Sequence, residues 1–339
     1  MKAAVFYEHG DLDNLVVDEV PDPELGPGDA RVQVKACALN HLDLFVREGF
    51  PGLKLPLPHV GGTDIAGVVV EVADDVEGVA VGDEVVVNSG LNFDADENGD
   101  LIVPPQPEIV GETRWGGLAE QVVVPADHLV PKPRELSWEE AAAVPLTLLT
   151  VVRMCRKARL KPGERVLVPG AGGGLGVMMV QVAKAFGAWV CATTSTPEKV
   201  AKVRSLGADL VIDYREDPAW GKTAYMATDK QGFDVVLESV GQAVWKHAVR
   251  ALGNGGRLVT CGATTGPLGE TDIRLIFWKQ LSVIGSTMGT PDDLRTGLDL
   301  MAQGKVKAIV DSVYSLDDAK EAQALMERGE MFGKIVVRP

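Results

Sequence analysis

The segment from Glu164 to Gly176, which reads ERVLVPGAGGGLG, constrains the fold more than any other part of the chain. An apolar strand pattern at 165–168 runs into a glycine cluster, a helical pattern follows from Leu175 to Phe186, and a second strand pattern covers 188–194. Glycines let the backbone approach a pyrophosphate, whose charge is met by the N–H groups of the helix N-terminus. A glycine-rich turn that binds nothing is the alternative, but so many glycines are costly without a ligand. The order of strand, turn, helix and strand therefore predicts a dinucleotide-binding fold.

Strand and helix patterns alternate through the middle of the chain. Short apolar strands are expected at 165–168, 189–193, 210–212, 235–237, 257–260 and 282–284, with helices in most of the gaps. This alternation predicts an α/β fold with a doubly wound parallel sheet of the Rossmann type.

The N-terminal third has a different pattern, with short alternating strands separated by turn residues such as Gly26-Pro27-Gly28-Asp29. It predicts a β-rich, barrel-like domain. After Gly289 about fifty residues remain, which are marginal as a domain alone, so we expect them to return to the first domain. The predicted domains are 1–130 with 290–339, and 131–289.

Charge and composition exclude several classes of partner. The chain has 339 residues and a formal net charge of −15, which argues against nucleic acid and anionic membranes as partners. It shows no signal-peptide core and no apolar run that would span a bilayer, so a cytoplasmic location is expected. The four cysteines form no C-x-x-C pair and lie in apolar surroundings, which predicts buried thiols rather than disulfides or zinc ligands.

The end of the second strand predicts which dinucleotide binds. A site that prefers NAD has an acidic residue about 20 positions after the glycines, where it bonds the ribose 2′-hydroxyl. Here that count reaches Thr193 and Thr194, followed by Ser195 and Lys199, and the third strand is followed by Tyr214 and Arg215. Hydroxyls and cations at this place predict NADP(H), with its 2′-phosphate.

Two of these residues have alternative roles. Ser195 and Glu198 also form a capping-box pattern around Pro197, so the alternative role for Ser195 is the N-cap of the next helix, and the two roles are compatible. Lys199 has two equally compatible roles, as a solvated residue on the surface of that helix or as a contact to the phosphate.

Several motifs together resemble the medium-chain dehydrogenase/reductase family over essentially the whole chain. They are VKACALNHLD at 34–43, GTDIAGVV at 62–69, VGDEV at 81–85, AGGGLG at 171–176 and FGK at 332–334. The resemblance implies a GroES-like β-rich catalytic domain and a Rossmann NADP-binding domain. It places Ala171, Gly173 and Gly176 at the three fingerprint positions. With the strand ends, it gives these predicted cofactor-binding residues: Asn40, Thr150, Ala171, Gly173, Gly174, Leu175, Gly176, Thr194, Ser195, Lys199, Tyr214, Arg215, Ser239 and Lys334.

The zinc-dependent members of this family hold catalytic zinc with two cysteines and a histidine beside a glutamate. The matching positions here are Asn40, Thr63-Asp64 and about Leu146, and the stretch 88–113 lacks the cysteines of the structural zinc lobe. Asparagine, threonine and leucine do not make a tetrahedral zinc site. The chain thus resembles the zinc-free quinone oxidoreductase, or zeta-crystallin-like, branch, and we predict no metal. That branch often has a tyrosine where this chain has Phe45, so no contact through that hydroxyl is expected.

The resemblance implies hydride transfer from NADPH to a small electrophilic acceptor, a quinone or an α,β-unsaturated carbonyl. Asn40 and Thr63 are the predicted hydrogen-bond donors, Asp64 orients its neighbours, and Thr150 lies beside the nicotinamide. An alcohol/aldehyde oxidoreductase and a non-catalytic NADPH-binding protein remain alternatives. His41 and His59 are either proton donors or hydrogen-bonded structural residues.

Two further segments of the chain suggest a subunit interface and a surface loop. The apolar run 281–285 is the sixth and outermost predicted strand, and an exposed edge of this kind favours a homodimer. The acidic run 94–101 is similar to the first half of a calcium loop, but its twelfth position is Pro105 and no helices flank it, which favours an acidic surface loop.

Overall fold

The computed structural model describes residues 1–50, 52–97 and 100–339, and the chain divides into two compact units. The first comprises 1–146, 289–295 and 308–339, and the second comprises 147–288 and 296–307. The domain boundaries expected from the sequence lay after residue 130 and after residue 289. The first boundary lies later because α2 (Trp138–Ala142) packs against strands of the first unit.

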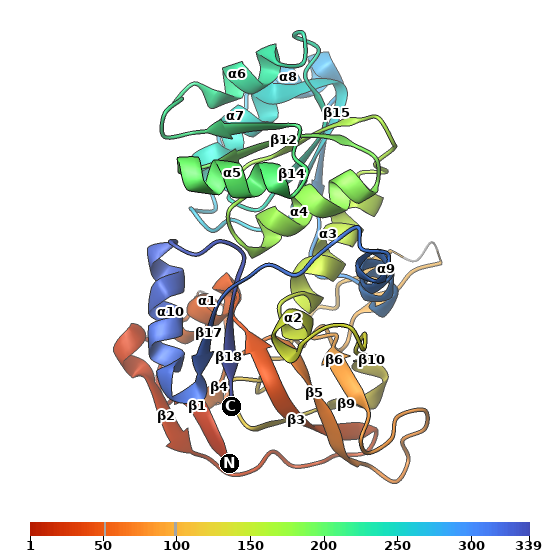
Figure 1. Ribbon diagram of the computed structural model, residues 1–339, viewed down its shortest axis with the longest axis vertical. Coiled ribbons are helices and arrows are strands. Elements are labelled where there is room, and N and C mark those ends of the chain that lie inside the picture. Colours follow the sequence, from red (N-terminus) through yellow and green to blue (C-terminus); the bar gives the residue numbers. More distant parts are fainter. Residues whose placement is uncertain (51, 98–99) are drawn as a thin grey trace. The chain divides into compact units, whose positions relative to one another are not determined.

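The second unit contains the doubly wound parallel sheet that the sequence predicted (Figure 1). Its strand order is β13-β12-β11-β14-β15-β16, and every neighbouring pair is parallel. From the central pair β11 and β14, successive strands along the chain are added on opposite sides of the sheet. Ligands of such sheets bind where the strand order reverses, at the carboxyl ends of the strands. The strands are β11 (Arg165–Val168), β12 (Trp189–Thr194), β13 (Leu210–Asp213), β14 (Phe233–Glu238), β15 (Leu252–Thr260) and β16 (Ser282–Gly285).

Helices cover these strands and bury their apolar side chains. Helix α4 packs against β11 and β12, α5 against β12 and β13, and α7 against β14 and β15. The central strands are buried almost without alternation, as expected for a parallel sheet covered on both faces. The sequence did not predict α6 and α8, because seven residues are too few for a clear helical period. The helices are α3 (Pro145–Lys157), α4 (Gly174–Ala185), α5 (Pro197–Ser205), α6 (Trp220–Met226), α7 (Gln242–Ala251) and α8 (Ile273–Lys279).

The first unit is β-rich, with a seven-stranded sheet and a three-stranded sheet. The larger sheet has the order β10-β6-β5-β3-β18-β17, with β9 also paired to β3, and the smaller has the order β2-β1-β4. The strands are β1 (Lys2–Phe6), β2 (Leu15–Glu19), β3 (Asp29–Ala38), β4 (His59–Val60), β5 (Asp64–Val72), β6 (Glu84–Val87), β9 (Gln121–Pro125), β10 (Leu129–Pro131), β17 (Val310–Ser315) and β18 (Lys334–Arg338).

The C-terminal strand completes the N-terminal sheet. β18 pairs antiparallel with β3 and parallel with β17, so the end of the chain lies beside a strand from its beginning (Figure 1). Helices α1 (His41–Glu48) and α10 (Ala319–Arg328) contact each other in this unit. Helix α9 (Pro291–Ala302) is divided between the units, because residues up to Arg295 belong to the first and those from Thr296 to the second. Because β18 pairs with β3, Lys334 at the start of β18 lies next to the end of β3.

The acidic run forms a short hairpin of β7 (Asp94–Ala95) and β8 (Leu101–Ile102). Asn98 and Gly99, which belong to the same acidic run, lie outside the described residues. In the part of the chain that the structure describes, no helix combines the length and apolar character that crossing a membrane requires.

Candidate active site

The glycine turn joins β11 to α4, and a side chain would be strained at Gly170 and would clash with the backbone at Gly176. Gly170 has a φ of +71°, and Gly173 is the N-cap of α4. A Cβ on Gly176 would lie 2.6 Å from both Ala171 Cα and Gly170 O. Two bonds fix the turn to β12, because Ala171 N donates to Thr193 O (2.8 Å) and Gly170 N to Thr193 Oγ1 (3.2 Å). The first N–H groups of α4 have no acceptor in their own helix, which makes this end a fitting place for an anionic pyrophosphate.

Polar side chains from β12 and α5 lie over this turn. A Cβ placed on Gly172 would be 3.3 Å from Thr194 Oγ1, 3.3 Å from Lys199 Cδ and 3.9 Å from Lys199 Nζ. Thus the Lys199 ammonium lies close to the glycine backbone. This is the position the sequence assigned to a cation for the 2′-phosphate.

The N-cap of α5 is Thr196, so the alternative role of Ser195 as the cap is excluded. Thr196 Oγ1 accepts from Lys199 N (3.2 Å), and Pro197 is at the first helical position. The residue directly before that position must be the cap, which excludes Ser195 from the role. The hydrogen bond that caps α5 therefore does not involve the Ser195 hydroxyl.

The next strands bring the other predicted cofactor residues to the same edge of the sheet. Tyr214 N donates to Thr194 O (2.9 Å), which places Tyr214 beside the end of β12, and Arg215 is exposed next to it. Ser239 follows β14 directly. Because the carboxyl ends of parallel strands meet at one edge, the glycine turn, Tyr214 and Ser239 follow strands that end on one side of the sheet.

Glu238, which no sequence motif singles out, shapes the turn that contains Ser239. The side chain is fully buried, and its Oε1 accepts from Val240 N (2.5 Å) and Gly241 N (2.6 Å), while Oε2 accepts from Thr260 Oγ1 (2.9 Å). Its only sequence signal is a single acid at the end of an apolar strand.

In the first unit, Asn40, Asp64 and Lys334 form a closed polar network. Lys334 Nζ donates to Asn40 Oδ1 (2.6 Å) and to Asp64 Oδ2 (2.8 Å), and Asn40 Nδ2 donates to Asp64 Oδ2 (3.0 Å). Asp64 Oδ1 accepts from Leu146 N (2.6 Å). Asp64 is fully buried and Lys334 is 4% exposed, so this ion pair lies in the interior, whereas Asn40 is half-buried. The sequence assigned Lys334 to the cofactor, but here its ammonium bonds the two predicted catalytic residues.

A second buried carboxylate, Asp43, holds the backbone of this site. Its Oδ2 accepts from Asn40 N and its Oδ1 from Gly62 N, each at 2.7 Å. Burial raises the pKa of Asp43 to about 6, although the two N–H donors favour the charged form. Asp43 thereby fixes the start of α1, a helix that sequence analysis did not predict, and with it the position of Asn40.

The remaining predicted residues have less access to a ligand. Thr63 is fully buried, and its hydroxyl has no hydrogen-bond partner among the described residues. Thr150 is on α3 in the second unit, buried at 5% exposed. Burial lowers the pKa of His59 to about 4, so that imidazole is neutral, with Nε2 3.4 Å from Gly111 O. Burial also lowers the pKa of His41, and the Lys334 charge adds to this effect.

The residues at the expected zinc position do not fit that metal. Leu146 supplies a backbone N–H rather than a ligand atom, and Asp64 is already paired with an ammonium. Zinc sites in proteins use cysteine, histidine and carboxylate donors in a tetrahedral set. Over residues 1–50, 52–97 and 100–339, no three such side chains are arranged to hold a metal.

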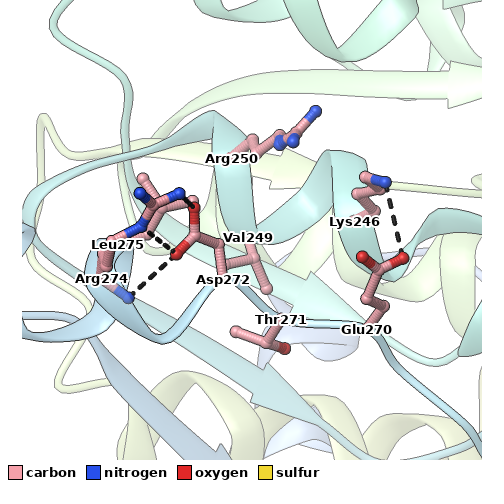
Figure 2. A pocket seen from close by; sticks show the side chains of 8 residues that line it. All are labelled: Lys246, Val249, Arg250, Glu270, Thr271, Asp272, Arg274 and Leu275. Atoms are coloured by element: carbon pink, nitrogen blue, oxygen red, sulfur yellow. Dashed lines mark hydrogen bonds and ion pairs between the residues drawn. The ribbon is translucent and has the colours of Figure 1, made fainter.

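A cavity of about 280 Å³ lies elsewhere in the second unit, between α7 and the segment before α8 (Figure 2). Its charges are largely paired, since Lys246 Nζ is 3.5 Å from Glu270 and Arg274 bonds Asp272 at 2.9 Å. None of the predicted cofactor residues lines it. We therefore do not assign it to the candidate site. The lining residues are Lys246, Val249, Arg250, Glu270, Thr271, Asp272, Arg274 and Leu275.

Comparison with known proteins places both units in described families. Residues 26–134 match the alcohol dehydrogenase GroES-like domain, and residues 174–303 match the zinc-binding dehydrogenase family. The chain is 33% identical to a crotonyl-CoA reductase of Streptomyces collinus, over 96% of this chain and 81% of the relative. It is 31% identical to an NADPH-dependent alkenal/one oxidoreductase of Arabidopsis thaliana, a chloroplastic protein, over 100% and 80%. The solved structure of an NAD-dependent alcohol dehydrogenase superposes with a TM-score of 0.95 at 42% identity, covering both chains fully.

Proposed function

Because the chain belongs to the medium-chain dehydrogenase/reductase family and is an oxidoreductase, we propose that it reduces an electron-poor double bond or a quinone with NADPH. NADPH, when bound, supplies the hydride for this reaction. The residues of this chain bind the cofactor, position the acceptor and stabilise the charge that develops on it.

The observation that carries the proposal is the Asn40 amide held by Lys334 and Asp64 where zinc-dependent relatives have a metal ligand. Interconversion of an alcohol and a carbonyl concentrates charge on an alkoxide, which a metal stabilises as a Lewis acid. Reduction of an enone or quinone spreads the charge over an enolate or aromatic system. Neutral hydrogen-bond donors are sufficient for such a delocalised anion, and Asn40 is one.

Two relatives support this class of substrate. One is named for crotonyl-CoA, whose crotonyl group is an α,β-unsaturated acyl group, and another for alkenals and alkenones. We expect the acceptor of this protein to be a small electrophile of the same chemical type.

The test is a comparison of turnover with NADPH across quinones, enones, unsaturated thioesters and simple aldehydes. The proposal predicts that at least one activated double bond or quinone is reduced faster than every simple aldehyde. Faster turnover of simple aldehydes than of all the conjugated acceptors would reject it.

A second candidate is oxidoreduction of an alcohol and an aldehyde. It is favoured by one observation, the 42% identity to a structure named as an NAD-dependent alcohol dehydrogenase. The same panel, run in the oxidation direction with alcohols and either NAD⁺ or NADP⁺, distinguishes this candidate from the first.

We expect NADPH to bind more tightly than NADH, and Lys199→Ala to weaken NADPH binding at least tenfold while leaving NADH nearly unchanged. The Lys199 ammonium lies over the glycine turn, and β12 ends in threonines rather than an acid. One charge-assisted contact to a phosphate is worth about 1.5–3 kcal/mol. Fluorescence titration gives the dissociation constants, and Lys202→Ala on the same helix, whose ammonium pairs with Glu198, is the matched control. Equal affinity of the wild type for both cofactors would contradict the assignment.

We further propose that catalysis needs no zinc. Protein purified without chelator is expected to contain far less than one zinc per chain, because Asn40, Thr63 and Leu146 do not form a zinc site. Elemental analysis after dialysis measures this directly. One zinc retained per chain, together with loss of turnover on chelation, would disprove it.

We propose that the protein is a homodimer that pairs through the β16 edge. Among the described residues β16 has a strand neighbour on one side only, and α8, which precedes it in the chain, exposes Ile273, Phe277 and Trp278, the last at 83%. Exposed apolar surface of this kind marks an interface. The charges of both signs around the Figure 2 cavity suit a two-fold contact, in which each surface meets a copy of itself.

Light scattering at micromolar concentration is expected to give about twice 36.0 kDa for the wild type and about 36.0 kDa for Trp278→Asp. A charge at this apolar position would be desolvated on association. Val81→Asp, at an exposed apolar position of the first unit, should leave the dimer intact. A monomeric wild type would refute the proposal.

We propose a cytoplasmic location. The net charge of −15 argues against nucleic acid and anionic membranes as partners, so none is proposed.

A further inference from the structure

The buried network at the end of β3 gives Lys334 a role of its own. We propose that Lys334 is a positioning residue, which fixes the Asn40 amide so that an N–H rather than the carbonyl faces the acceptor. This inference rests on the proposed function, because it assigns Asn40 to the acceptor's oxygen. It differs from a cofactor-binding role for Lys334.

The network permits only one orientation of the amide. Lys334 Nζ lies 2.6 Å from Asn40 Oδ1, and Asp64 Oδ2 lies 3.0 Å from Asn40 Nδ2. Exchanging the oxygen and nitrogen would place an NH₂ group against an ammonium and a carbonyl oxygen against a carboxylate. Both contacts would be repulsive in a site where Lys334 and Asp64 are almost completely buried.

The fixed orientation determines what Asn40 can offer a ligand. Its oxygen accepts from Lys334 and one amide proton goes to Asp64, which leaves the second amide proton without an acceptor among the described residues. Asn40 is only half-buried, in contrast to Asp64 and Lys334, so of the three it is the residue that can meet a ligand. Asn40 is therefore presented as a hydrogen-bond donor.

Lys334 also strengthens that donor. An ammonium bonded to an amide oxygen draws electron density from the nitrogen, and the effect is larger where water is excluded. Asp64 neutralises the ammonium at 2.8 Å, so the pair polarises Asn40 while adding no net charge. Growing negative charge on an enolate or quinone oxygen then meets a polarised N–H.

The experiment compares Lys334→Met with a double variant, Asp64→Asn with Lys334→Met. Removing Lys334 alone leaves Asp64 as an uncompensated buried charge, which can impair folding. The double variant removes both charges and keeps the inference testable if the single variant does not fold. The control is Lys320→Met, which removes a surface ammonium paired with the exposed Asp13.

Three quantities are measured for each variant: kcat for the best enone or quinone, the dissociation constant of NADPH, and the side-chain amide resonances of Asn40 in protein labelled with ¹⁵N-asparagine. We expect kcat to fall about 10- to 100-fold in both Lys334 variants, part of the loss of a full oxyanion donor. The NADPH constant should stay within about twofold of wild type, and the Asn40 resonances should move. None of these should change in Lys320→Met.

Three results would overturn the inference. An unchanged kcat in the folded variants would show that the amide needs no such fixing. A weakening of NADPH binding as large as the loss of kcat would assign Lys334 to the cofactor instead. Unmoved Asn40 resonances would show that Lys334 does not set the amide. Because the resonances need no turnover, they test Lys334 even if the wild type reduces no conjugated acceptor, a result that would count against the proposed function alone.

Discussion

Replacing Asn40 with alanine is expected to lower kcat for conjugated acceptors by one to three orders of magnitude, which is roughly 1.4–4 kcal/mol of transition-state stabilisation. The amide N–H that Lys334 and Asp64 hold in place is the proposed contact to the developing negative charge. The ion pair between Lys334 and Asp64 remains in this variant, so the fold should be retained.

Steady-state kinetics with NADPH and the best enone or quinone measure this loss, and thermal unfolding checks the fold. Asn254→Ala, at an exposed position of β15, is the matched control and should leave kcat unchanged. If Asn40→Ala retains kcat within about twofold, the amide does not stabilise the transition state and another donor must be sought.

The glycine turn gives the second large effect, through two alanine substitutions that separate folding from binding. In Gly176→Ala the new Cβ would lie 2.6 Å from backbone atoms of Ala171 and Gly170, so the turn must shift. We expect a loss of about 1–3 kcal/mol of stability, typical of overpacking, and NADPH binding weakened by about 100-fold because the N–H groups move away from the phosphates.

Gly173→Ala is the matched variant, since no atom lies within 4 Å of the added Cβ and the φ of −87° suits alanine. Its thermal midpoint without cofactor should equal that of the wild type, while NADPH binding should fall about tenfold or more, because the methyl group occupies the space where the pyrophosphate approaches the backbone. Calorimetry and fluorescence titration give the two quantities. Unchanged affinity in Gly173→Ala would place the pyrophosphate elsewhere.

Much of the fold could be predicted because its signals are local. Most strands of the parallel sheet are short apolar runs, and Arg165–Val168 begins and ends where the sequence placed it, whereas β15 starts at Leu252, before the predicted 257. The last strand, β16, lies at the edge of the sheet as expected. Short helices such as α1 and α6 escaped prediction because tertiary contacts and capping, rather than a long apolar period, stabilise them.

The sequence by itself determined the parallel sheet and the glycine turn that joins its first strand to a helix, because these depend on residue types at short spacings. Only the tertiary structure decided the partners of the predicted catalytic residues. Asn40 and Lys334 are 294 positions apart, and they meet because β3 and β18 pair antiparallel with Ala38 opposite Val336. β5 pairs with β3 so that Asp64 lies opposite Ala38, which brings the carboxylate to the same strand ends. Strand register between distant segments has no local signal, since it is set by the burial of whole strands.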